Sequence, residues 1–169
     1  MSDFEAVLCE KKADTTVTKK KLVFVCTGNT CRSPMAAALY NHLFADGEFA
    51  ASSAGLYADG SPLSDKASAA LMERGVLPTP SNDYRRHVSR NLDEKIVSEA
   101  DLIVGISGSH AMEIMFRHPA YASKIAALSE DVPDPYGGDA SVYRTCLDML
   151  ERILTASFGG GSAEGTDCE

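Results

Sequence analysis

The chain has 169 residues, 44% of them hydrophobic and 24% charged, and these proportions are ordinary for one soluble globular domain. The net charge of −8 argues against nucleic acid and anionic membrane surfaces as partners, although it does not exclude a local phosphate site. No apolar run approaches the ~20 residues that span a bilayer, and the polar N-terminus lacks the apolar core of a signal peptide. The five cysteines show no framework spacing, which favours a reducing cytoplasm.

Strand and helix patterns alternate along the chain. The predicted strands cover residues 22–25, 49–53, 102–106 and 124–128, and the predicted helices cover 34–44, 64–74, 93–99, 109–117 and 141–155. This alternation predicts an α/β fold in which helices cover both faces of a parallel sheet. We expect one domain over residues 21–157, between a mobile N-terminal extension at 1–20 and a mobile, glycine-rich tail at 158–169.

Residues 26–34, Cys-Thr-Gly-Asn-Thr-Cys-Arg-Ser-Pro, connect the first predicted strand to the first predicted helix. Such a loop surrounds its first cysteine with backbone N–H groups at the positive end of a helix dipole. The same arrangement binds a phosphate dianion and stabilises a cysteine thiolate. An inert buried cysteine is one alternative, and a metal site that includes Cys31 is another. No metal is expected, because no Cys/His cluster with ligand spacing lies nearby.

The residue types in this loop are typical of a cysteine-dependent phosphatase. Cys26 is the candidate nucleophile, and its attack on phosphorus would give a phosphocysteine intermediate. Arg32 can hold two phosphoryl oxygens with its planar guanidinium group. Backbone amides from Thr27 to Arg32 supply the remaining donors. Gly28 allows close approach of the backbone to a ligand, and Asn29 tolerates left-handed dihedral angles.

Four motifs stand in order along the chain: residues 26–34, Ser-Ser-Ala-Gly at 52–55, Ser-Glu-Ala-Asp-Leu-Ile-Val at 98–104, and Asp-Pro-Tyr-Gly-Gly at 134–138. Together they resemble the low-molecular-weight protein phosphatases, which include phosphotyrosine and phosphoarginine phosphatases, over residues 21–155. The resemblance implies a three-layer, flavodoxin-like fold with a central four-stranded parallel sheet. It also implies phosphorylated proteins as substrates and no cofactor.

Two serines receive roles from this resemblance. It implies that Ser33 donates a hydrogen bond to the Cys26 thiolate and that Ser53 braces Asn29. Helix capping and strand-end hydrogen bonding are the alternatives for the two serines.

Asp134 is the candidate proton donor for the leaving group. It lies between two prolines and before two glycines, in a segment that could fold over the Cys26 loop. We expect Asp134 to act as general acid in the first step and as general base in the second. A simple turn aspartate is one alternative, and Asp131 is the competing carboxylate.

Cys31 has two open interpretations. A reversible disulfide with Cys26 would protect the nucleophile from irreversible oxidation. The alternative is a small side chain that packs beneath the loop.

Two positions bear on the substrate. Phosphotyrosine enzymes of the family usually carry a bulky aliphatic residue in place of Thr30 and a second aromatic residue in place of Gly137. Thr30 is small and polar, which suits a flat phosphoguanidinium group better than a phenol ring. Together with Tyr136, these residues resemble the protein arginine phosphatase branch. We therefore favour phosphoarginine as the substrate, with phosphotyrosine as the alternative.

Other functions fit the sequence less well. Arsenate reductases with this fold need further cysteines in mid-chain, and there are none between Cys31 and Cys146. An inactive phosphate-binding module would not need Cys26, Arg32 and Asp134 together. The four histidines are interpreted as structural or surface residues: His42, His87, His110 and His118. We expect a cytoplasmic monomer, although the sequence leaves the oligomeric state open.

Overall fold

A computed structural model describes residues 17–160. At its centre lies a four-stranded sheet in the order β2-β1-β3-β4, and each pair of neighbouring strands is parallel. The strands are β1 Lys20–Cys26, β2 Phe49–Gly55, β3 Leu102–Gly105 and β4 Ile125–Ala127. The parallel four-stranded sheet predicted from the sequence is thus confirmed.

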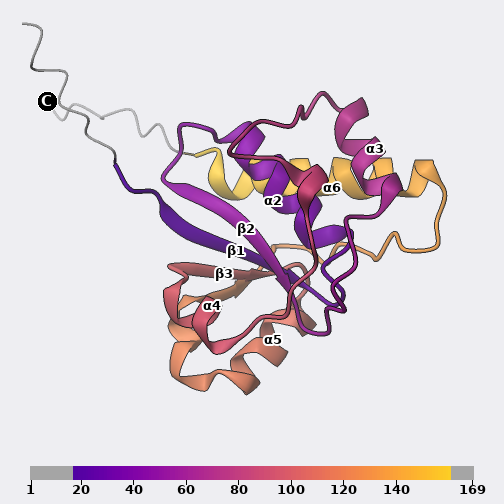
Figure 1. The fold of residues 1–169 in the computed structure, drawn as a ribbon. Helices are drawn as coiled ribbons and strands as arrows, with labels where there is room; N and C mark the ends of the chain where they lie inside the picture. Colours follow the sequence, from indigo (N-terminus) through magenta and orange to yellow (C-terminus); the bar gives the residue numbers. More distant parts are fainter. Residues whose placement is uncertain (1–16, 161–169) are drawn as a thin grey trace, which may run out of the picture.

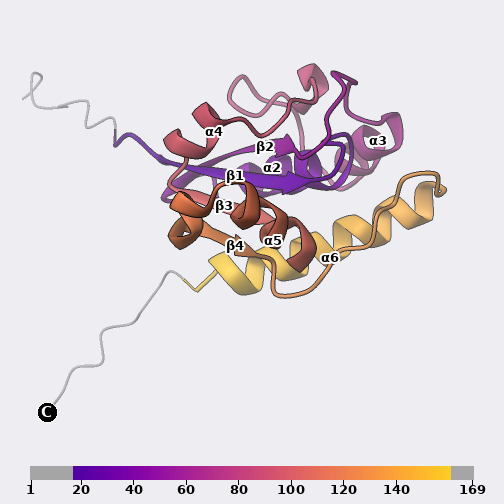
Figure 2. The same cartoon turned by 90° about the horizontal axis from the view of Figure 1, so that it is seen from below.

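Helices cover both faces of the sheet, as Figures 1 and 2 show. One layer contains α2 Arg32–Leu43, α3 Asp65–Glu73 and α6 Ala140–Phe158, and the opposite layer contains α4 Glu94–Glu99 and α5 Gly108–Arg117. Two short 3-10 helices complete the described elements: η1 Tyr84–Arg86 and η2 Pro119–Lys124. The three-layer, flavodoxin-like architecture is therefore confirmed.

From Leu22 to Cys26, β1 is buried on both sides because it lies between the two helical layers. Its successive side chains point to opposite faces of the sheet. Leu22 and Phe24 belong to the core formed with α2, α3 and α6, whereas Val23 and Val25 belong to the core formed with α4 and α5. Packing against both layers holds the end of the strand, where Cys26 lies, in a fixed position.

Several element boundaries differ from the sequence predictions, including those of β1, α2 and α6. β1 begins at Lys20, inside the predicted extension, because Lys20 pairs with Phe49 of β2. α2 begins at Arg32, two residues earlier than predicted. α6 continues to Phe158, inside the predicted tail, because the Phe158 ring packs against Tyr40 with 5.0 Å between ring centroids. The mobility predicted for the two terminal segments otherwise concerns residues 1–16 and 161–169, which lie outside the described residues.

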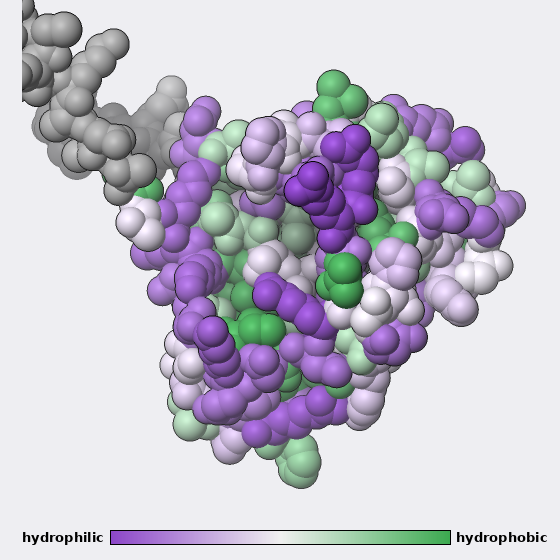
Figure 3. Space-filling model, in the orientation of Figure 1, coloured by the Kyte–Doolittle hydropathy of each residue, from purple (hydrophilic) through white to green (hydrophobic). Residues whose placement is uncertain are grey.

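The surface visible in Figure 3 is largely hydrophilic. In the face that Figure 3 shows, hydrophilic residues predominate and apolar residues are scattered among them. Within residues 17–160, none of the helices combines the length and the apolar character needed to cross a bilayer.

Candidate active site

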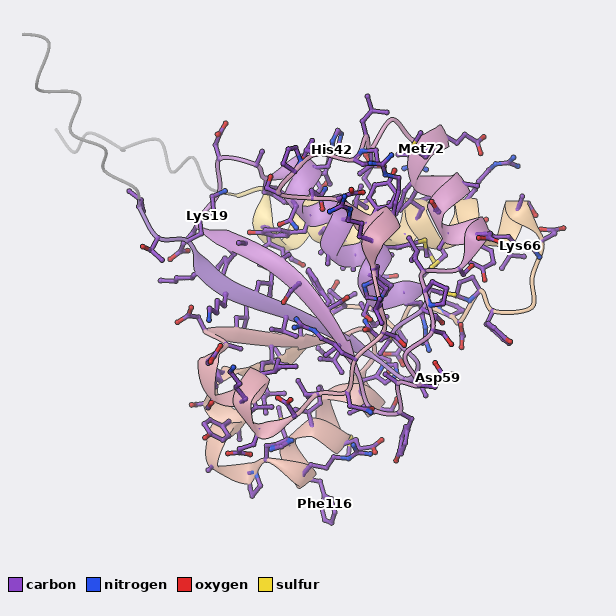
Figure 4. The ribbon with its side chains drawn as sticks, in the orientation of Figure 1. Lys19, His42, Asp59, Lys66, Met72 and Phe116 are labelled. Atoms are coloured by element: carbon purple, nitrogen blue, oxygen red, sulfur yellow. The ribbon has the colours of Figure 1, made fainter. Side chains whose placement is uncertain are left out.

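A cavity lies at the carboxyl end of the sheet, beside the loop that joins β1 to α2. Ligands of open α/β folds bind in such a crevice, where neighbouring strands send their connections to opposite faces. The cavity has a volume of about 530 Å³. Its lining consists of the Cys26 loop (residues 26–32) and of Tyr57, Asp59, Ser61, Pro62, Leu63, Ser64, Asp65, Asp134 and Tyr136. Figure 4 places Asp59 in the loops at this edge of the sheet.

The Cys26 thiol lies at the base of the cavity, where it is 2% exposed. Its Sγ atom accepts a hydrogen bond from the backbone N–H of Asn29 at 3.3 Å and lies 3.0 Å from Ser33 Oγ. Asn29 Nδ2 donates to Ser33 Oγ at 2.9 Å, so the single proton of the Ser33 hydroxyl is left for Cys26 or for the Ala54 carbonyl. Donors that converge on sulfur in this way stabilise a thiolate over a thiol.

Asn29 holds the shape of the loop. It adopts the left-handed backbone conformation, with φ of 58°, and it is completely buried. Its amide nitrogen donates to Ser33 and Ser53, each at 2.9 Å, and its amide oxygen accepts the Arg90 N–H at 3.0 Å. The structure therefore places Ser53 against Asn29, as the resemblance implied.

The surroundings of Gly55 explain why the Ser-Ser-Ala-Gly motif ends in glycine. A Cβ atom at this position would lie 2.8 Å from the Thr27 carbonyl oxygen and 2.9 Å from Asn29 Cβ. Any larger residue would push the Cys26 loop out of place. Among residues 17–160, a Cβ atom at Gly28 would meet only Thr30 Oγ1, at 3.8 Å, so no contact in this part of the chain requires that glycine. Its predicted role in ligand approach stays a prediction.

Arg32 links the Cys26 loop to the segment that carries Asp134. The guanidinium group is buried, donates to the Val132 carbonyl at 3.3 Å and lies 3.4 Å from Asp134 Oδ2. Asp134 is half exposed, and its other oxygen accepts the Tyr136 N–H at 3.1 Å. The structure thus brings Cys26, Arg32 and Asp134 together around one cavity.

Asp131, the competing carboxylate, has a different position. It accepts the backbone N–H of Gly108 at 2.8 Å, at the start of α5. Negative charge at a helix N-terminus is favourable, so this contact gives Asp131 a structural function. Asp131 does not line the cavity.

Cys31 and Thr30 lie on the α3 side of the cavity. Thr30 accepts the backbone N–H of Ser64 through its carbonyl at 2.9 Å. Cys31 Sγ lies 3.4 Å from the buried hydroxyl of Tyr143. Burial is the larger cause that raises the pKa of Tyr143 to about 12, and the contact with Cys31 is the second cause. Cys26 and Cys31 are both free thiols, so their disulfide stays a prediction. Tyr136 is 79% exposed at the rim of the cavity.

Two histidines contact the Cys26 loop, which the sequence did not indicate. His87 Nε2 donates to the Asn29 carbonyl at 2.7 Å, and His110 Nε2 lies 3.0 Å from Thr27 Oγ1. Burial lowers the pKa of both imidazoles and so favours their neutral forms. By contrast, His118 pairs with Glu94, and His42 is exposed on α2. Within the described part of the chain, no three His, Cys, Asp or Glu side chains are placed to hold a metal ion.

Comparisons with known proteins agree with this geometry. The sequence model of the low molecular weight phosphotyrosine protein phosphatase family matches residues 21–159. The chain belongs to this family. The resemblance inferred from the four sequence motifs is therefore confirmed, and the protein is a low molecular weight protein phosphatase.

Relatives of this phosphatase carry two kinds of name. A protein-arginine-phosphatase of Bacillus subtilis is 35% identical over 144 residues, which are 79% of this chain and 91% of the relative. A probable low molecular weight protein-tyrosine-phosphatase, EpsP of Ralstonia nicotianae, is 33% identical and covers 81% and 92% of the two chains. A solved structure of the YwlE arginine phosphatase, a mutant with a phosphorylated active-site serine, has a TM-score of 0.71 at 33% identity, covering 79% of this chain and 90% of that one.

Proposed function

We propose that this phosphatase hydrolyses phosphoarginine in proteins through a phosphocysteine intermediate on Cys26. The observation that carries the proposal is the charge pattern of the cavity. Loop amides and the Arg32 guanidinium form its base, whereas the carboxylates of Asp59, Asp65 and Asp134 line its walls. Phosphoarginine has the matching arrangement, since a phosphoryl dianion is joined to a cationic guanidinium group.

In the first step, the Cys26 thiolate attacks phosphorus and forms a P–S bond while the P–N bond breaks. Arg32 and the loop amides hold the equatorial oxygens, where negative charge is concentrated. Asp134, in its protonated form, donates its proton to the departing guanidine nitrogen. The products of this step are arginine in the substrate protein and phosphocysteine in the enzyme.

In the second step, water attacks phosphorus and the P–S bond breaks. Asp134, now a carboxylate, accepts a proton from this water. Inorganic phosphate leaves, and the Cys26 thiolate is restored. Ser33 and the Asn29 N–H stabilise that thiolate as a leaving group, because both contact Sγ.

The neighbourhood of Thr30 supports phosphoarginine as the substrate. Thr30 lines the cavity, and a hydroxyl can accept a hydrogen bond from a guanidinium N–H, which an aliphatic side chain cannot do. Next to Tyr136 in the chain, Gly137 has φ of 79° and no side chain. One aromatic wall, Tyr136, is therefore left on this side of the cavity.

Phosphotyrosine is the second candidate substrate, and one observation favours it. Tyr57 and Tyr136 both line the cavity, and a phenol ring could pack between such aromatic side chains. The chemistry would be the same, with a P–O bond broken in place of the P–N bond. The name of the Ralstonia relative agrees with this alternative.

The comparison of two substrates tests the proposal. We expect kcat/KM to be higher for a phosphoarginine protein than for a phosphotyrosine peptide. Thr30→Ile should shift the ratio toward phosphotyrosine about tenfold, the equivalent of one hydrogen bond. Thr79→Ile is the matched control, because Thr79 is exposed and does not line the cavity. A wild-type preference for phosphotyrosine would establish the second candidate in place of the first.

The setting of this activity is proposed as well. We expect the enzyme to act in the cytoplasm, where a reduced thiolate persists. Phosphorylated proteins would be its partners. The family match over residues 21–159 supports a single catalytic domain close to the predicted 21–157.

A further inference from the structure

We infer that His110 is a positioning residue, which orients the hydroxyl of Thr27 as a hydrogen-bond donor to the phosphoryl group in the cavity. This role requires that the cavity bind a phosphoryl group, as the proposed function states. It is independent of the preference for phosphoarginine over phosphotyrosine.

The contacts form a continuous chain from α5 to the cavity. His110 is 6% exposed and lies in the first turn of α5. Its Nδ1 atom is 2.7 Å from Oγ of Ser107, the residue that caps this helix, and its Nε2 atom is 3.0 Å from Thr27 Oγ1. Thr27 lines the cavity directly beside Cys26. A buried imidazole is therefore connected to the hydroxyl of a residue that lines the cavity.

The positions of the protons decide what this chain does. When the Ser107 hydroxyl donates to Nδ1, the neutral imidazole carries its proton on Nε2 and donates it to Thr27 Oγ1. The proton of Thr27 is then left for an acceptor in the cavity. In the other tautomer, Nε2 accepts that proton and turns it away from the cavity. A bound oxyanion favours the first arrangement, because the hydroxyl then donates to negative charge.

Burial favours the neutral form of His110, and charged side chains face it from three directions. Arg32 faces it from α2, Glu113 from its own helix, and Asp131 and Asp134 from the segment before α6. Burial lowers the pKa of His110, and Arg32 adds to this effect, whereas the three carboxylates oppose it. A neutral imidazole contributes through the direction of its hydrogen bonds and not through its charge.

Two matched substitutions separate this role from simple packing. The side-chain nitrogen of His110→Gln reaches close to the position of Nε2 and keeps a donor to Thr27. His110→Asn reaches only the position of Nδ1 and keeps a contact to Ser107. Thr27→Val removes the hydroxyl, and Thr27→Ser retains it. His42→Ala is the surface control, since Figure 4 shows His42 on the α2 layer, away from Asp59 and the cavity edge.

The probes are para-nitrophenyl phosphate as substrate and inorganic phosphate as competitive inhibitor. We expect Thr27→Val and His110→Asn each to weaken phosphate inhibition about tenfold, as for one hydrogen bond to a charged group. Phosphate should inhibit the double variant, Thr27→Val with His110→Asn, as strongly as it inhibits Thr27→Val alone, because both changes remove the same hydrogen bond. His110→Gln, Thr27→Ser and His42→Ala should stay within about threefold of the wild type.

Other outcomes would overturn the inference. One is phosphate inhibition in His110→Asn that equals the wild type. Another is a double variant whose loss is the product of the single losses. A third is an equal loss in His110→Gln and His110→Asn together with lower melting temperatures, which would make His110 a packing residue. Failure of the phosphoarginine preference would change none of these phosphate measurements, so the two proposals fail separately.

Discussion

The Asn29→Ala variant tests whether the loop conformation is built by one side chain. The substitution removes three side-chain hydrogen bonds, to Ser33, Ser53 and the Arg90 N–H. It also leaves alanine in the left-handed conformation. At ~1 kcal/mol for each hydrogen bond and ~1 kcal/mol for the backbone, we expect the free energy of unfolding to fall by about 3 to 4 kcal/mol.

Activity should fall more than stability alone explains. The backbone N–H of Asn29 contacts Cys26 Sγ, so a displaced loop misplaces the donors around the nucleophile. We expect kcat/KM for para-nitrophenyl phosphate to fall about 100-fold at a temperature where the variant is folded. Urea unfolding gives the stability, and steady-state kinetics gives the activity.

Asn41→Ala is the matched control for this experiment. Asn41 on α2 also makes three side-chain hydrogen bonds, two with the backbone of Ala51 and one with Asn82, and it lies outside the cavity lining. Its removal should cost a similar free energy of unfolding while kcat/KM stays near the wild-type value. The reasoning would be refuted if Asn29→Ala kept wild-type activity, or if Asn41→Ala lost activity to the same extent.

Three further predictions concern the carboxylates and the histidines. Asp134→Asn should lower kcat for phosphoarginine at least 100-fold without lowering the melting temperature, and undiminished turnover would place the acid elsewhere. Asp65→Asn should lower kcat/KM for phosphoarginine more than for phosphotyrosine, because only phosphoarginine carries a cationic guanidinium group. An equal effect on both substrates would refute the proposed match between the wall carboxylates and that group. Because burial lowers the pKa of His87 and His110, the unfolded chain binds more protons below about pH 6.5. The free energy of unfolding should therefore fall from pH 6.5 to 5, by at most ~1.4 kcal/mol per pH unit for each histidine; urea unfolding that gives equal stability at both values would contradict this.

The parts of the structure that depend on local sequence were predictable. The apolar run of β1, the loop after it and the following helix are encoded by adjacent residues, so the position of Cys26 at the end of a strand followed directly. The alternation of strand and helix patterns gave the parallel sheet for the same reason. Asp134 was found because its motif is specific, although 108 positions separate it from Cys26 in the chain.

Contacts between distant segments were not predictable from one sequence. His87 and His110 reach the Cys26 loop from 58 and 83 positions along the chain, and nothing in their local sequence marks that contact. Gly55 is the last residue of β2, where a glycine ordinarily indicates only the turn that comes next. Its function becomes clear only from the structure, which places the Thr27 carbonyl against it. Phe158 was assigned to the tail because glycines follow it, whereas its packing against Tyr40 keeps it in α6.

Trapping the covalent intermediate tests the central claim most directly. The enzyme and a phosphoarginine protein are mixed, quenched within milliseconds and digested for mass spectrometry, with Cys26→Ala as the control. We predict one phosphoryl group on the peptide that contains Cys26 in the wild type, and none on the corresponding peptide of Cys26→Ala. Arginine released without any phosphoryl group on Cys26, or a phosphoryl group on another residue, would contradict the mechanism.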